Sequence, residues 1–279
     1  MLTVDFERLG VEPGDKLLDI GAGRGRHAFQ AARLGAQVIA ADLNHADLLA
    51  TQDTFAAMVV DDEALPETWG FMAAQTNALA LPFPDSSLDR IIASEIMEHI
   101  PDDAGAMAEL FRVVRPGGTV AITVPRWLPE KLCWWLSEEY HAEIGGHIRI
   151  YSESELHAKM LAAGFETFDS HHAHGLHSPY WWLKCAVGVK NDNAWPVRQY
   201  HRMLVWDIMK HPWPTRAAEA VLTPIIGKSY VAYFYKPEDA DDLTSESESV
   251  QTRHVKSAKQ DSAAVASLIA DDNEPARSH

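Results

Sequence analysis

The sequence predicts an α/β fold in which helices cover both faces of a doubly wound, mostly parallel, seven-stranded sheet. Short apolar runs rich in Val, Ile and Ala alternate with amphipathic segments of helical period. Uninterrupted apolar runs are typical of parallel strands that are buried on both faces. A glycine-rich turn, GAGRG at 21–25, follows the first run and precedes a helical segment. This alternation, with such a turn at its first junction, indicates the doubly wound class.

Each element follows from a local pattern. Strands are expected at the apolar runs 16–21, 37–42, 90–95 and 119–125, and at two later ones, 166–175 and 229–237. Helices are expected at 26–35, 102–118 and 152–165. The first helix ends on a glycine, the second is stopped by Pro-Gly-Gly, and the third begins with a Ser/Glu capping pattern.

Two insertions and a tail complete the expected domain organisation. One insertion, 126–150, follows the fifth strand, and the other, 176–228, separates the last two strands. Ligands of open α/β sheets bind outside the carboxyl ends of the strands, so we expect both insertions to form a lid or acceptor pocket there. Residues 1–237 should form the domain. The remainder is rich in Ser, Asp and Glu, which predicts a disordered acidic tail over 238–279.

The composition excludes some classes of protein. The chain has 279 residues and a formal net charge of −16, which disfavours nucleic acid as a partner because a polyanion would be repelled. Two cysteines do not make a disulfide framework. The N-terminal stretch lacks the apolar core of a signal peptide, and no run approaches the roughly 20 apolar residues of a membrane span. We therefore expect a cytoplasmic protein.

The glycine loop fits S-adenosylmethionine better than a dinucleotide. A dinucleotide fingerprint has a third glycine where this chain has Arg26, and its strand is apolar where this chain has Asp19. The spacing here is G-x-G-x-G, through Gly21, Gly23 and Gly25. A carboxylate at the end of the strand would repel a pyrophosphate but attract the ammonium group of S-adenosylmethionine. We therefore expect S-adenosylmethionine as the cofactor.

Three segments carry a resemblance to a known family. LLDIGAGRGRH, at 17–27, is similar to the first motif of the class I S-adenosylmethionine-dependent methyltransferases, in particular the type 11 group that contains ubiquinone and menaquinone biosynthesis enzymes. NALALPFPDSSLDRIIASEIMEHIPD, at 77–102, and ELFRVVRPGGTVAITVP, at 109–125, resemble the later motifs of that family. The resemblance covers roughly 12–168 and returns at 229–236, and it implies the Rossmann-like methyltransferase fold.

The resemblance also implies which residues hold the cofactor. Asp42 matches the acid that binds the ribose hydroxyls, and Ala78 would offer its backbone N–H to the adenine. The family commonly has Asp where this chain has Asn77, whose amide oxygen can still accept a hydrogen bond from the adenine amino group. The expected cofactor contacts are Asp19, Gly21, Ala22, Gly23, Gly25, Asp42, Leu43, Asn77, Ala78, Ser94 and Glu95.

Tryptophan and histidine concentrate in and between the two insertions. Eight of nine tryptophans and nine of fourteen histidines lie between positions 127 and 213. These aromatic residues either form the core of added helices or, where Trp-Trp pairs adjoin polar groups, stack on sugars or contact a membrane surface. The expected partner is a small-molecule acceptor that contains a sugar or resembles a lipid.

Histidines are the candidate bases, because a hydroxyl or carbon acceptor must lose a proton. His147 resembles a family position that often faces the acceptor and is the first candidate; His141 is the second. His99 matches a family histidine near the methionine end of the cofactor, with helix packing as an equal alternative. The stretch HHAHGLH, at 171–177, could ligate a metal, but hydrogen bonds to substrate or to the strand end are favoured, and no metal site is expected.

The expected function is S-adenosylmethionine-dependent methyl transfer to a small molecule, with O-methylation of a glycosylated or lipid-like metabolite favoured. C-methylation of a quinone-like ring is the alternative within this class. A non-catalytic S-adenosylmethionine-binding protein and a nicotinamide dehydrogenase are alternatives of other classes. Arg26 and Asp19 disfavour the dehydrogenase.

Overall fold

The computed structural model describes residues 2–61, 71–141 and 146–238. Contacts divide the chain after Pro237 into two units, and all that follows concerns the first, 1–237. The expected tail lies outside the described residues except for Glu238, so its disorder stays a prediction.

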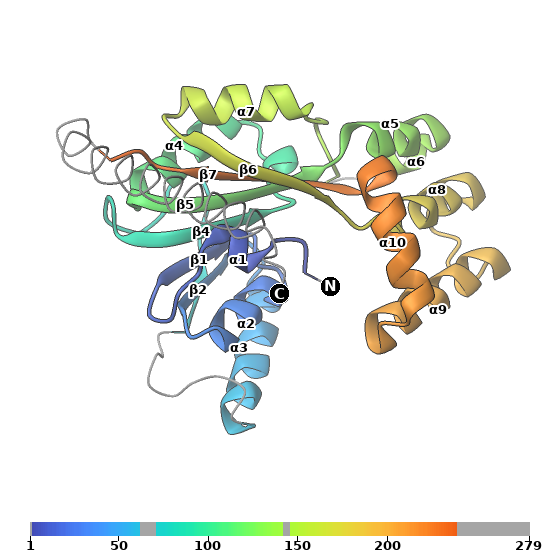
Figure 1. Ribbon diagram of the computed structural model, residues 1–279, viewed down its shortest axis with the longest axis horizontal. Helices are drawn as coiled ribbons and strands as arrows, with labels where there is room; N and C mark the ends of the chain where they lie inside the picture. The colour runs from blue at the N-terminus through green and yellow to red at the C-terminus, as the bar shows by residue number, and fades with distance from the viewer. Residues whose placement is uncertain (1, 62–70, 142–145, 239–279) are drawn as a thin grey trace, which may run out of the picture. The chain divides into compact units, whose positions relative to one another are not determined.

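One seven-stranded sheet forms the centre of this unit, in the order β3-β2-β1-β4-β5-β7-β6 (Figure 1). The strands are β1 (Lys16–Ile20), β2 (Gln37–Asp42), β3 (Met72–Gln75), β4 (Leu88–Ser94), β5 (Val114–Pro125), β6 (Glu166–Ala173) and β7 (Ser229–Tyr235). The pairs among β1 to β5 are parallel, and β7 runs antiparallel to both of its neighbours. The expected doubly wound, mostly parallel sheet is therefore confirmed.

Helices cover both faces of the sheet. The helices of the described residues are α1 (Phe6–Leu9), α2 (Arg26–Arg33), α3 (His45–Val60), the 3-10 turn η2 (Met97–His99), α4 (Asp103–Val113), α5 (Trp127–Leu136), α6 (Glu138–His141), α7 (Glu153–Ala162), α8 (His177–Val187), α9 (Trp195–Lys210) and α10 (Trp213–Ile226). Side chains of α1, α2 and α3 pack on one face, and those of α4 and α7 pack on the other. Figure 1 shows α4 and α7 on the side of the sheet opposite α2 and α3.

Local chemistry accounts for several helix ends. Ser152 caps α7 by accepting a hydrogen bond from the Glu155 backbone N–H, as the capping pattern predicts. Helix α4 is shorter than expected: it ends at Val113 rather than at 118, because Val114 is already extended and begins β5. The Pro-Gly-Gly turn therefore lies within the β5 segment and does not end the helix.

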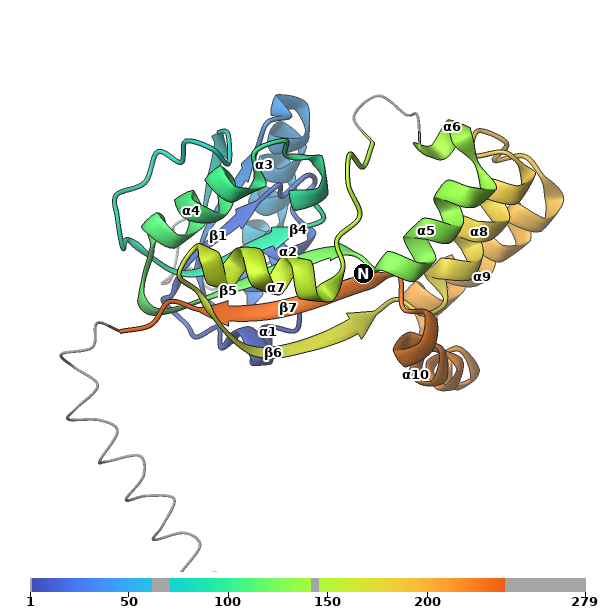
Figure 2. The same cartoon turned by 90° about the horizontal axis from the view of Figure 1, so that it is seen from above.

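The two insertions pack against each other. Helices α5 and α6 come from the first insertion and α8, α9 and α10 from the second, and α5 contacts α8 directly. The Trp182 indole N–H donates a hydrogen bond to the Pro129 carbonyl oxygen at 3.1 Å, which links the two helices. Figure 2 shows α5, α6, α8 and α9 gathered at one end of the sheet, beyond β7.

None of the described helices is both long and apolar enough to cross a lipid bilayer. The expected cytoplasmic location stays a prediction.

Candidate active site

The glycine loop after β1 is held by close contacts that only glycine permits. Gly21 has φ 72°, and a Cβ atom there would lie 2.1 Å from the Ile96 side chain. At Gly25, with φ 78°, a Cβ would come within 2.7 Å of Thr51. The Gly23 N–H donates to the Asp42 carboxylate at 2.8 Å, so the loop is tied to the end of β2. A Cβ atom added to Gly23 would meet no atom of the described chain within 4 Å, which leaves room for a ligand on that side of the backbone.

Asp19 lies beneath this loop and is 1% exposed. One carboxylate oxygen accepts the Ala28 backbone N–H of α2 at 3.0 Å, and the other has no hydrogen-bond partner in the described chain. Burial raises the pKa of Asp19 to about 7, although the Ala28 N–H and the Arg26 charge act in the opposite direction. A buried carboxyl oxygen without a donor is the group that a ligand ammonium would satisfy.

A groove of about 340 Å³ lies at the carboxyl edge of the sheet. Its walls come from the ends of four adjacent strands, β3, β2, β1 and β4. The lining residues are Ile20, Gly21, Asp42, Leu43, Thr76, Asn77, Ala78, Glu95, Ile96, His99 and Ile100. This is the edge at which doubly wound folds bind ligands.

Six of the eleven expected cofactor contacts line this groove, and five do not. The six are Gly21, Asp42, Leu43, Asn77, Ala78 and Glu95, whereas Asp19, Ala22, Gly23, Gly25 and Ser94 are absent from its lining. Ser94 is buried and its hydroxyl lies 3.0 Å from that of Thr123, between β4 and β5. The sequence did not single out the apolar residues Ile96 and Ile100, which carry no polar signal.

The turn after β3 bears on the adenine prediction. The Asn77 amide oxygen accepts the Leu79 backbone N–H at 3.0 Å, which closes a local Asx-type turn. An amide oxygen has two acceptor sites, so this bond leaves one for a ligand. Asp42 is engaged in a similar way, because its second oxygen accepts the Asn44 N–H at 2.8 Å.

A second cavity, of about 510 Å³, lies between the sheet edge and the inserted helices. It is lined by His99, Trp134, Tyr140, Gly146, His147, Trp181, Val189, Lys190, Asp192 and Lys228. His99 lines both this cavity and the groove, so the two spaces adjoin at that side chain.

His147 is held by a buried carboxylate. Its Nδ1 lies 2.6 Å from an Oε1 oxygen of Glu130 on α5, whose side chain is only 2% exposed. Burial alone would raise the pKa of Glu130, but the hydrogen bond and charge of His147, with Lys228, hold that pKa below the usual value. An ionised carboxylate can only accept, so Nδ1 carries a proton, and in the neutral form of the ring Nε2 keeps its lone pair.

The His99 ring is held at Nδ1 in the same way as the His147 ring. Its Nδ1 lies 3.1 Å from the Gly146 carbonyl oxygen, which can only accept, so again Nε2 carries the lone pair. Beneath both rings lies Glu98, whose side chain is fully buried. Burial, followed by the neighbouring charge of Glu95, raises the pKa of Glu98 well above the usual glutamate value.

The other expected residues have different placements. His141 ends α6, and its side chain lies outside the described residues. Arg149 makes a structural contact: it pairs with Asp103 and donates to the Pro101 carbonyl at 2.7 Å.

The histidines of 171–177 are engaged separately. His171 stacks on Tyr233, His172 pairs with Glu153 at 3.0 Å, and His174 lies 2.9 Å from the Thr3 hydroxyl. In the described chain they do not combine into a set of three metal-type ligand atoms.

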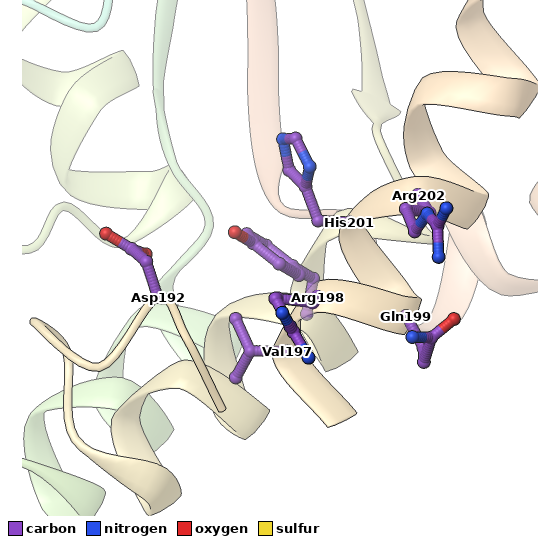
Figure 3. Close-up of a pocket in the computed structure, with 7 residues that line it drawn as sticks. Asp192, Val197, Arg198, Gln199, His201 and Arg202 are labelled. Atoms are coloured by element: carbon purple, nitrogen blue, oxygen red, sulfur yellow. The ribbon is translucent and has the colours of Figure 1, made fainter. Parts of the chain in front are cut away.

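A third cavity, of about 690 Å³, lies away from the sheet edge. Figure 3 shows Asp192 at one side of it, well apart from Gln199 and Arg202 on α9, with Val197 and Arg198 between them. The described residues that line it belong to α8, α9 and the loop that joins them. No end of a strand is among these described residues, so the larger volume of this cavity does not make it the catalytic centre.

Comparison with known proteins identifies the segment that builds the groove. The family described as "Methyltransferase domain" matches residues 18–122. Residues 18–122 are a methyltransferase domain. The resemblance expected from the glycine loop and the later motifs is thereby confirmed over this segment.

The chain is also similar to curated methyltransferases over part of its length. Methyltransferase GfsG of Streptomyces halstedii is 42% identical over 118 residues, which are 42% of this chain and 40% of that protein. The 27-O-demethylrifamycin SV methyltransferase of Amycolatopsis mediterranei is 29% identical over 175 residues, or 62% of each chain. The chain therefore spans about 40% of the length of GfsG.

Solved structures share the fold more widely. A geranyl diphosphate methyltransferase in complex with SAM aligns with 83% of this chain and 82% of its own, with a TM-score of 0.54 and 16% identity. The likeness thus extends beyond the methyltransferase domain to most of 1–237.

Proposed function

We propose that this protein transfers the methyl group of S-adenosylmethionine to an oxygen atom of a small, glycosylated or lipid-like acceptor. The observation that carries the proposal is the meeting of two cavities at His99. One is a groove built by the methyltransferase domain, and the other is an aromatic cavity lined by His147, which pairs with the buried Glu130. Methyl transfer needs donor and acceptor side by side, and proximity and orientation supply much of its acceleration.

The residues at the groove fit S-adenosylmethionine. Asp19 is not in the groove lining but lies next to it at the end of β1, and it offers for the ammonium group a buried oxygen that has no donor among the described residues. Asp42 offers its carboxylate at the groove wall for the ribose. Asn77 and Ala78 lie in the turn where the adenine would bind. Gly21, Gly23 and Gly25 keep the loop thin, and Ala22, Leu43, Ser94 and Glu95 are retained as proposed contacts. The bound cofactor supplies a methyl group on a cationic sulfur.

The second cavity fits an acceptor with apolar or sugar-like surface. Trp134 and Trp181 line it, and indole rings are side chains that stack on such ligands. Lys228 lies 5.6 Å from the Trp181 ring centre, so a cation also faces this cavity. We therefore propose that the insertions 126–150 and 176–228 form the acceptor site.

Proton removal from the acceptor is assigned to His147. Its Nε2 lone pair is available because Glu130 holds the Nδ1 proton, and the Glu130 carboxylate would stabilise the imidazolium once Nε2 is protonated. A hydroxyl acceptor requires such a base, and a positioned base contributes about 10²–10⁴ in rate. The name of the rifamycin methyltransferase of Amycolatopsis mediterranei describes methylation at oxygen, which supports the same choice.

The proposal is tested with cell extract and methyl-labelled S-adenosylmethionine, with and without the full-length protein, followed by mass spectrometry of labelled products. One labelled small molecule with the methyl on oxygen is expected. A methyl on carbon would favour the quinone-type alternative. Calorimetry that found NAD but not S-adenosylmethionine bound would reject the cofactor assignment.

Two variants test the base. His147→Asn and Glu130→Gln should lower kcat by about 10²–10⁴ and leave the affinity for S-adenosylmethionine unchanged. The matched control is His211→Asn, because His211 is exposed at the end of α9 with φ 46°, a conformation that asparagine tolerates. Full activity in His147→Asn would eliminate it as the base.

A further inference from the structure

Three ligand-type side chains meet below the junction of the two cavities. Glu98, His99 and His147 each place one nitrogen or oxygen atom within 4.8 Å of the other two. The Glu98 Oε1 oxygen lies 3.8 Å from the His147 Nε2 and 4.0 Å from the His99 Nε2. These separations are too long for hydrogen bonds. The two rings therefore face one carboxylate without bonding to it.

Glu98 is the unusual member of this group. Its side chain is 0% exposed, and neither carboxylate oxygen has a hydrogen-bond partner in the described residues. Leaving a buried polar group without a partner is costly, so such a group needs a specific explanation. The atoms that it faces are Nε2 lone pairs, which can give it no proton while the rings are neutral.

The opposite edges of both rings are already fixed. Glu130 holds the Nδ1 of His147 at 2.6 Å, and the Gly146 carbonyl holds the Nδ1 of His99 at 3.1 Å. Metal-binding histidines are oriented in this way, with the nitrogen that does not bind the metal hydrogen-bonded to a carboxylate or a backbone carbonyl. Both Nε2 atoms thus present lone pairs toward the same carboxylate.

We propose that Glu98, His99 and His147 bind a divalent transition-metal ion of the zinc type. Two imidazoles and one carboxylate with further positions open form a ligand set of catalytic zinc sites and of other first-row metals. Ligand atoms around tetrahedral zinc lie about 3.3 Å apart, given bond lengths of about 2.0–2.1 Å. The two histidine nitrogens would each need to approach the Glu98 oxygen by about 0.5–0.7 Å from their 3.8 Å and 4.0 Å separations. All three ligand atoms already lie within 4.8 Å of one another.

The site would face the acceptor. His99 and His147 both line the second cavity, so open coordination positions would be reachable from it. A divalent cation there would bind a hydroxyl oxygen of the acceptor and lower its pKa, as it does for bound water. This use rests on the proposed function, whereas metal binding itself does not. With the ion bound, Nε2 of His147 would be a metal ligand and could not act as the base. The ion would then activate the acceptor hydroxyl, which His147 activates in the metal-free protein.

The test uses the full-length protein, freed of metal by dialysis against a chelator and then titrated with Co²⁺. We expect saturable visible absorption from one Co²⁺ per chain, and its loss when Zn²⁺ is added. Glu98→Gln and His99→Asn should each weaken Co²⁺ binding by about 100-fold or more, and Glu130→Gln by about 10–100-fold through the orientation of His147. His211→Asn should bind as tightly as the unaltered protein.

Absence of saturable absorption, or unchanged binding in both Glu98→Gln and His99→Asn, would overturn the inference. If Glu98→Gln does not fold, Co²⁺ binding by His99→Asn alone tests the inference. The His99 side chain is 37% exposed and therefore tolerates replacement more readily. S-adenosylmethionine is titrated into the same metal-free protein. Binding of the methyl donor without binding of Co²⁺ rejects the metal site alone, and the reverse result rejects the proposed function alone.

Discussion

Replacing Asp19 by Asn should stabilise the ligand-free protein above pH 7 and at the same time remove its affinity for S-adenosylmethionine. The side chain is 1% exposed, and among the described residues only one of its oxygens has a hydrogen-bond partner. Its charge is therefore unfavourable until a cationic ligand arrives. Asn keeps the shape and can still accept the Ala28 N–H, so the change removes the charge with little change in packing.

The magnitude follows from the pKa of Asp19. In the folded protein the pKa is about 7 against an ordinary value of 3.8. Between these values the folded state binds a proton that the unfolded state does not, so the free energy of unfolding falls as pH rises, by about 1.4 kcal/mol per pH unit. The full loss is about 4 kcal/mol at pH 8. The buried amide NH₂ of Asn lacks a partner and costs about 1–3 kcal/mol, which leaves a net gain of about 1–3 kcal/mol.

Urea unfolding of both proteins at pH 5 and pH 8, without ligand, measures this gain. The advantage of Asp19→Asn should grow with pH, since only the unaltered carboxyl loses its proton across this range. Calorimetry at pH 8 should then show that Asp19→Asn no longer binds S-adenosylmethionine. A variant that is less stable than the unaltered protein at pH 8, or that binds the cofactor equally well, would refute the reasoning.

Three further changes are predicted. Asp42→Ala should weaken S-adenosylmethionine binding by about 1–3 kcal/mol in calorimetry, because a charged hydrogen-bond acceptor is lost. The control Asp53→Asn, at an exposed position, should leave binding unchanged. Equal weakening in both variants would count against a ribose role for Asp42. His27 is 2% exposed and burial lowers its pKa to about 3. Between pH 3 and 6.5 His27 takes up a proton only in the unfolded state, so the free energy of unfolding falls as the pH is lowered. In His27→Gln the fall from pH 7 to pH 5 should be smaller by about 2 kcal/mol. If urea unfolding showed the same difference between the two proteins at both pH values, this prediction would be contradicted. Asp103→Asn should cost about 3–5 kcal/mol in urea unfolding, because it leaves Arg149 with an unpaired charge; Asp85→Asn, with a 77% exposed carboxylate, should change stability by less than about 0.5 kcal/mol.

The sequence was sufficient for most of the sheet because its strands are apolar, short and separated by strong turn signals. The runs at 16–21, 37–42 and 90–95 correspond to β1, β2 and β4. Strand β3 was not located, because MAAQ at 72–75 has no β-branched residue and lies at an edge of the sheet, where pairing with β2 determines its structure. The end of α4 was misplaced for a related reason, since pairing of Val114 with Leu88 on β4 makes that residue extended.

The sequence predicted those site residues whose proximity follows from their spacing along the chain. It did not predict the residues whose role depends on burial in the folded protein. The glycines and Asp42 lie in one local unit of strand, turn and strand, so their proximity follows from the chain itself. Glu130 and Glu98 were missed because a carboxylate among apolar neighbours is ordinary on a half-exposed helix. Only the packing of α5 and η2 against the sheet edge makes them 2% and 0% exposed. One signal was present: Glu130 is the one acid within WLPEKLCWWL, a stretch that is apolar apart from Glu130 and Lys131.

The direct packing of α5 on α8 has a consequence for how acceptor choice could be exchanged between related enzymes. The Trp182–Pro129 hydrogen bond joins the two inserted segments, and Cys133 and Cys185 on the same two helices are both buried. A chimera that received only one segment from a relative would leave the indole N–H without its acceptor and would uncover apolar surface. Both segments must therefore be transplanted together, as one unit, for a new substrate preference to arrive on an intact scaffold.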